Sequence, residues 1–168
     1  MLPNPLHPAV VHFPVVLAVL LPLFAAGALW AIRKGTTPRR AWIVPVALSL
    51  ALALSAWVAV QTGEAQDERV ERVVAEQPLE THEEAAELFL ALSGGLALFV
   101  VAGLARGRLG AVARGLATAG AVVLVGVGAQ VGHTGGQLVY RYGAASAYTG
   151  NAAVGLGDRP ATRGDRDE

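Results

Sequence analysis

Four long stretches without a charged residue constrain this sequence more than any other feature. Between successive Asp, Glu, Lys and Arg residues lie the runs 1–32, 41–63, 88–105 and 115–140. A helix needs about 20 apolar residues to cross the hydrocarbon core of a bilayer, because each residue advances it by about 1.5 Å. Charged residues make up only 15% of the chain, which argues against a water-soluble globule. We therefore predict an all-α fold, a four-helix transmembrane bundle with helices near 9–32, 41–63, 82–105 and 112–142.

The charges in the connections predict how these helices are oriented. The connections 33–40 and 106–114 contain seven basic residues and no acid, whereas residues 64–87 carry nine acids and two arginines. Basic residues near helix ends are retained on the cytoplasmic side of a membrane. We expect a multi-pass protein of the bacterial inner (cytoplasmic) membrane with its N- and C-termini outside.

The acidic connection and the C-terminal tail have patterns of their own. Val70, Val73 and Val74 follow helical spacing among charged neighbours and predict a short amphipathic outer-loop helix. Thr81 and Glu84 form a capping-box pattern that predicts the start of the third helix at His82. The segment 144–168 is polar and rich in glycine, so we predict a transmembrane domain over 1–143 followed by a disordered outer tail.

The four histidines are the candidate functional residues. At about 1.5 Å per residue, His7 and His12 lie roughly 39 and 32 Å, His82 roughly 36 Å and His133 roughly 28 Å from the basic end of their helices. All four therefore fall at the outer edge of a hydrocarbon core about 30 Å thick. Ionisable groups at membrane depth are functional candidates. We expect the four to face one cavity, with His82 and His133 as the best ligand pair and His7 and His12 as the other.

The start of the first helix contains a proline that predicts a bend. Pro8 suits the first position of a helix, where no amide donor is needed. Pro14 cannot donate to the carbonyl of Val10, so a helix running from Pro8 is bent in its first two turns. On a straight helix His7 and His12 point about 140° apart. A bend or an extended start is what would aim both of them into the bundle.

The composition excludes several classes of function. Thirteen basic residues balance thirteen acidic ones, so no overall positive field exists to hold nucleic acid. The chain has no cysteine, which excludes disulfides, thiolate metal sites and iron–sulfur clusters. Any metal must therefore be held by His, Asp, Glu or Met side chains.

Two motifs resemble a known family. The strings His7-Pro8-Ala9-Val10-Val11-His12-Phe13-Pro14 and Gly132-His133-Thr134-Gly135-Gly136-Gln137-Leu138-Val139-Tyr140-Arg141-Tyr142-Gly143 are similar to the HPxxVHFP opening and GHxGGxLVYxxG closing of a bacterial integral-membrane family, catalogued as a domain of unknown function. The resemblance covers about residues 6 to 143. Some members are joined to cytochrome c or Rieske iron–sulfur domains, which implies work near periplasmic electron transfer. Such domains hold their cofactors through cysteines, which this sequence lacks.

Three functional hypotheses follow. The first is a redox protein that binds haem b through histidines of different helices, with Arg141 and Tyr140 as partners of the propionates and a periplasmic electron-transfer partner beside the lipid bilayer. This would be an electron-transfer component rather than a stand-alone enzyme. The second is a copper, zinc or iron site built from the four histidines with Glu64 or Glu83, since imidazole suits all three metals. The third is a structural or assembly subunit without a cofactor.

The predicted orientation can be tested with single cysteines in this cysteine-free chain. Cysteine replacing Gln66 should react with a membrane-impermeant thiol reagent in intact cells, and cysteine replacing Thr37 should not, because the acidic connection is expected outside. Labelling at position 37 but not at position 66 would reverse the orientation.

Overall fold

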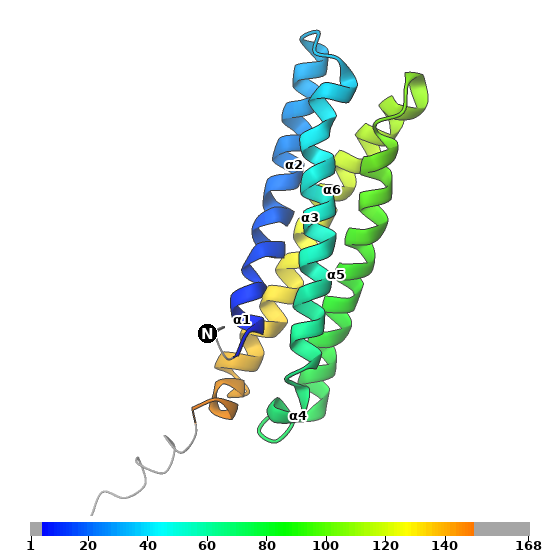
Figure 1. The fold of residues 1–168 in the computed structure, drawn as a ribbon. Coiled ribbons are helices and arrows are strands. Elements are labelled where there is room, and N and C mark those ends of the chain that lie inside the picture. Colours follow the sequence, from blue (N-terminus) through cyan, green and yellow to red (C-terminus); the bar gives the residue numbers. More distant parts are fainter. Residues whose placement is uncertain (1–4, 150–168) are drawn as a thin grey trace, which may run out of the picture.

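The computed structural model describes residues 5–149 and shows a bundle of four long helices (Figure 1). These are α2 (His12–Arg33), α3 (Pro38–Glu64), α5 (Glu76–Ala102) and α6 (Gly107–Tyr140). Three short elements accompany them: α1 (His7–Val10), α4 (Asp67–Val70) and the 3-10 helix η1 (Ala144–Ala147). No strand occurs among the described residues. The all-α prediction is confirmed.

All four long helices can span a membrane by length and composition. The candidate spans are His7–Arg33, Pro38–Glu64, Glu76–Ala102 and Gly107–Tyr140. Large apolar side chains such as Phe13, Leu54 and Leu98 are more than 60% exposed on the outside of the bundle. Such a surface is consistent with contact with lipid tails, where exposed apolar groups carry no cost.

The first span is interrupted as its proline predicts. α1 ends at Val10, Val11 is a turn, and α2 begins at His12. Pro14 has no N–H to donate to the carbonyl of Val10, so the helical hydrogen-bond ladder breaks there. α1 packs against both α3 and α2.

The third span begins earlier than the capping-box pattern predicts. α5 starts at Glu76, so Pro78 lies in its first turn, where a missing N–H costs nothing. Thr81 is inside the helix, and its hydroxyl donates to the carbonyl of Gln77 at 2.9 Å. The predicted start at His82 is therefore wrong. α3 and α6 also begin before the predicted 41 and 112, at Pro38 and Gly107.

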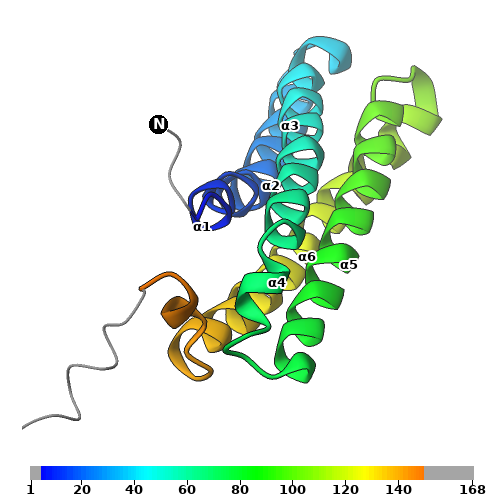
Figure 2. The same ribbon diagram turned by 60° about the horizontal axis from the view of Figure 1, so that its bottom comes forward.

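The long helices form a closed ring. α2 and α3 form one antiparallel hairpin and α5 and α6 another (Figures 1 and 2). α3 and α6 each contact both α2 and α5. The helices meet along a row of buried positions on each of them, called here the buried seam. In α2 the seam is Pro14, Ala18, Leu21, Ala25 and Ala28, and in α3 it is Trp42, Pro45, Ser49, Leu52, Ala56 and Ala59.

The spacing along these seams explains the near-parallel packing. Buried positions of α2 and α3 are alternately three and four residues apart, a seven-residue repeat that favours left-handed packing of neighbouring helices. Most seam residues are small, and Ser49 and Ser93 donate to carbonyls of their own helices. Small residues let membrane helices approach closely, which strengthens their van der Waals contact.

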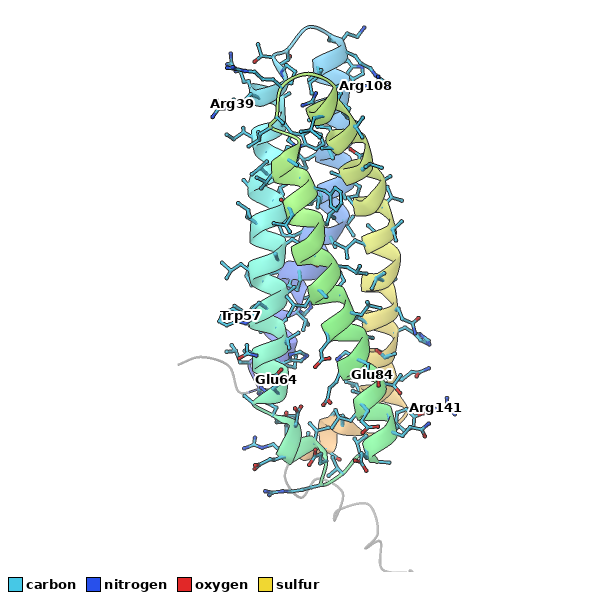
Figure 3. All side chains as sticks on the ribbon, turned by 90° about the vertical axis from the view of Figure 1, so that its right-hand side faces the viewer. Arg39, Trp57, Glu64, Glu84, Arg108 and Arg141 are labelled. Carbon is cyan, nitrogen blue, oxygen red and sulfur yellow. The ribbon has the colours of Figure 1, made fainter. Side chains whose placement is uncertain are left out.

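The two ends of the bundle differ in charge. Figure 3 shows Arg39 and Arg108 at one end and Glu64, Glu84 and Arg141 at the other. We call these the arginine end and the histidine end, since His7 and His82 lie near the second.

At the arginine end, Trp42 is fully buried and donates from Nε1 to the carbonyl of Val100 at 2.8 Å.

A small apolar cluster covers the histidine end. Val74, Leu79, Leu138 and Ala144 are buried together, with Val70 against them. α4 ends at Val70 and Val73 is exposed, so the predicted amphipathic helix is only one turn long. η1 belongs to this cluster, which makes the predicted boundary at 143 too early. The rest of the predicted tail, 150–168, lies outside the described residues.

Gly103 should be sensitive to a single added methyl group. A Cβ at Gly103 would overlap Nε1 of Trp42 and approach the Val100 carbonyl, both of which are fixed. We expect Gly103→Ala to lower the free energy of unfolding by about 1–3 kcal/mol, the usual cost of overpacking. Gly94→Ala on α5 is the control, because no atom lies within 4 Å of its added Cβ. Thermal unfolding in detergent measures both, and equal melting temperatures would contradict this packing.

Candidate functional site

The structure separates the four histidines into two pairs. His7 and His82 are half-buried within the bundle, with ring centroids 6.4 Å apart and ring planes at 84°. His12 and His133 are exposed on the outer surface. The expectation that all four face one cavity is therefore wrong. His82 meets His7 across the bundle, not His133, because α6 buries Thr134 and the next residue back points about 100° away.

His7 is held by the backbone of α3. Its Nδ1 lies 2.8 Å from the carbonyl oxygen of Ala59, and the Thr62 hydroxyl oxygen lies 3.4 Å from the same nitrogen. A carbonyl oxygen only accepts hydrogen bonds, so Nδ1 carries the proton and donates it. This leaves the lone pair of His7 on Nε2.

His82 is held in the same manner by a side chain of α6. Its Nδ1 lies 2.9 Å from the hydroxyl oxygen of Thr134. The single proton of that hydroxyl is donated to the carbonyl of Val131 at 3.0 Å, so the oxygen accepts from Nδ1–H of His82. The lone pair of His82 is therefore also on Nε2.

Each imidazole lies against a glycine of a neighbouring helix. A Cβ added to Gly63 would stand 3.3 Å from Cε1 and Nδ1 of His7, and one added to Gly135 would stand 3.0 Å from Cε1 of His82. Both separations are tighter than ordinary van der Waals contact, so a side chain at either position would press on the ring. The two glycines let the rings lie close to the helices whose groups hold them, α3 for His7 and α6 for His82.

The other predicted ligand residues lie apart from this pair. Nε2 of His133 accepts a hydrogen bond from Nε2 of Gln137 at 3.0 Å. Tyr140 is 92% exposed, and the Arg141 guanidinium lies 5.6 Å from the centre of the Tyr142 ring. Tyr140 and Arg141 line a shallow hollow together with His133.

The acidic side chains pair with polar groups other than the histidines. Glu64 is exposed and accepts from Gln61 Nε2 at 2.9 Å. Glu83 is half-buried. Partial burial and the carboxylates of Glu64 and Glu71 raise the pKa of Asp67. Within residues 5–149, no three His, Asp or Glu side chains are grouped so that they could hold a metal ion.

Four parts of this site were not predicted from the sequence: the Ala59 carbonyl, Gly63, Thr134 and Gly135. The Ala59 carbonyl leaves no trace in a sequence, because every residue has one. Thr134 and Gly135 are inside the closing motif, but their role follows from their position beside the seam of α6. The buried positions 117, 121 and 124 of α6 are alternately four and three residues apart. Continuing the same alternation along the helix leads to 135, so this spacing could have predicted that Gly135 faces the bundle.

The family described as Predicted membrane protein (DUF2231) matches residues 3–147, nearly all of the described bundle. No curated protein and no solved structure matches the chain. The matched residues include both histidines of the facing pair and all four candidate spans. The chain belongs to the family of predicted membrane proteins DUF2231.

Proposed function

We propose that this protein binds haem b, with Nε2 of His7 and Nε2 of His82 as the two axial ligands, and transfers electrons at the histidine end of the bundle. The observation that carries the proposal is the pair of facing imidazoles, each with Nδ1 committed to a hydrogen bond. Bundles commonly hold cofactors between facing helices in this manner.

The spacing of the rings supports two ligands on opposite sides of one metal ion. In such a site each coordinating nitrogen lies about 2.0 Å from the metal, and each ring centre lies farther out than its nitrogen. The two ring centres are then roughly 6 Å apart. The centroids of His7 and His82 are 6.4 Å apart. Ligands at the corners of a tetrahedron would bring the rings closer together.

The number of available ligands favours haem over a bare metal ion. A copper, zinc or iron site made only of side chains generally needs three or four ligands, and the described residues do not group three. A porphyrin supplies four nitrogen ligands itself, so two imidazoles complete the coordination of its iron. A haem held there would supply one-electron transfer.

The surrounding residues prepare the two ligands. The Ala59 carbonyl and the Thr134 hydroxyl fix the tautomer and the orientation of His7 and His82, which is the usual role of groups that bond the second nitrogen of a ligand histidine. By accepting from Nδ1–H they also make Nε2 a stronger electron donor. Gly63 and Gly135 keep the rings close to these acceptors.

The chain supplies its own controls for a test of haem binding. Haem b added to the detergent-purified protein should give the sharp absorption bands of a six-coordinate haem in the wild type. His7→Ala and His82→Ala should each lose that spectrum, because each removes one axial ligand. His12→Ala and His133→Ala should keep it, since both rings are exposed outside the pair. No spectral change in the wild type, or loss of the spectrum in His133→Ala, would contradict the proposal.

A second test addresses the hydrogen bond from His82 to Thr134. Thr134→Val keeps the shape but removes the acceptor, so we expect haem affinity to fall by about 10–100-fold, as for other partners of ligand histidines. Thr134→Ser should restore it. Nitrogen NMR of the protein without haem gives an independent readout: the Nδ1–H tautomer of His82 should lose population in Thr134→Val only. Equal affinities and tautomers in all three proteins would refute this role for Thr134.

A further inference from the structure

Two hollows meet at Gln137, on the side of α6 near the histidine end. The first is a polar cleft of about 210 Å³ between the first turns of α5 and the end of α6, and the second is a shallow hollow of about 410 Å³ along α6 itself. Gln137 is the residue that lines both, so the two hollows adjoin at its side chain, and together they are called here the Gln137 groove.

The polar cleft is suited to an uncharged hydrogen-bonding group. Its lining is Gln77, Pro78, Thr81, Thr134, Gln137 and Tyr142. Every one of these side chains is uncharged at neutral pH. The Thr81 and Thr134 hydroxyls are already donated to backbone carbonyls, so the donors that the lining offers are the amides of Gln77 and Gln137 and the hydroxyl of Tyr142. Charge complementarity therefore selects a neutral ligand group that accepts hydrogen bonds. Pockets for whole ligands start at about 300 Å³, so this cleft takes only a headgroup.

The shallow hollow is suited to an apolar chain. Gly132 and Gly136 form part of its floor, and nothing lies within 4 Å of a Cβ added to either. His133 and Tyr140, which also line it, are exposed on the outer surface of the bundle. Because α6 is a candidate span, this surface faces lipid. A chain attached to a headgroup in the polar cleft can leave over these glycines into the bilayer.

We propose that the Gln137 groove binds a membrane quinone, with the quinone ring in the polar cleft and its isoprenoid tail over Gly136 and Gly132. A quinone ring is flat, uncharged and carries two opposed oxygens, which matches amides and hydroxyls on facing helices. A phospholipid phosphate would instead need cations in the cleft. The one cation of the adjoining hollow, Arg141, faces the ring of Tyr142.

The groove also touches the histidine pair. Thr134 lines the polar cleft and accepts the hydrogen bond from His82. A ring seated in the cleft is thus separated from His82 by one side chain. The binding site does not depend on haem, and it can be tested on the protein with no haem added.

The experiment measures binding of decylubiquinone to the full chain in phosphatidylcholine nanodiscs, by calorimetry corrected with protein-free discs. Gly136→Leu fills the shallow hollow and Gln137→Leu removes the shared amide. Each should weaken binding more than tenfold. Gly126→Leu and Gln130→Leu are matched controls on α6, because both residues are exposed and line neither hollow. Gly126 also has open space around an added Cβ. Both controls should bind as the wild type does.

Two results would overturn the proposal. One is binding no stronger than to protein-free discs, or an equal affinity in the groove variants and their controls. The other is a co-purified phospholipid, detected by native mass spectrometry, that Gly136→Leu loses and decylubiquinone cannot displace. That second result would make the occupant a lipid. Equal melting temperatures of Gly136→Leu and Gly126→Leu check that the groove variant is folded.

Discussion

The close approach of helices along seams of small residues is the constraint on which the rest of this structure depends. In lipid, helices gain nothing from hiding apolar surface, so they associate through van der Waals packing. Ala18, Ala25, Ala56 and Ala59 bring the backbones together, and that proximity places a carbonyl of α3 against a ring from α1. With bulkier seams, His7 would not reach Ala59.

The seams also explain which histidines point inward. Counting back from Pro14 in alternate steps of three and four gives 11 and then 7, which includes His7 and omits His12. The seam of α3 continues from Ala59 to Gly63, and His82 is seven residues before buried Phe89 on α5. On α6 the spacing reaches Gly135 and omits His133. The four positions so reached are the two contacting pairs, His7 with Gly63 and His82 with Gly135.

The number of spans could be predicted from the sequence because it follows from residue counts. The expectation that all four histidines face one cavity was wrong, because height along a helix and angle around it are independent quantities. The start of α5 was missed for a different reason: Pro78 stops a helix in its interior but is tolerated in its first turn. The capping-box pattern suggested that Thr81 caps the helix, but its hydroxyl instead donates to the carbonyl of Gln77 inside the helix.

The segment after α6 determines where the chain leaves the bundle. Gly143, at a φ of 74°, turns the backbone so that η1 folds back, and the Tyr148 hydroxyl donates to Oε1 of Gln66 at 2.7 Å, with Arg69 over its ring. The chain therefore leaves the bundle beside the acidic connection, not from the tip of a free helix. Any domain joined after this point by a short flexible linker would therefore be held near the histidine end at an effective concentration of about millimolar, and the length of the linker would set that concentration.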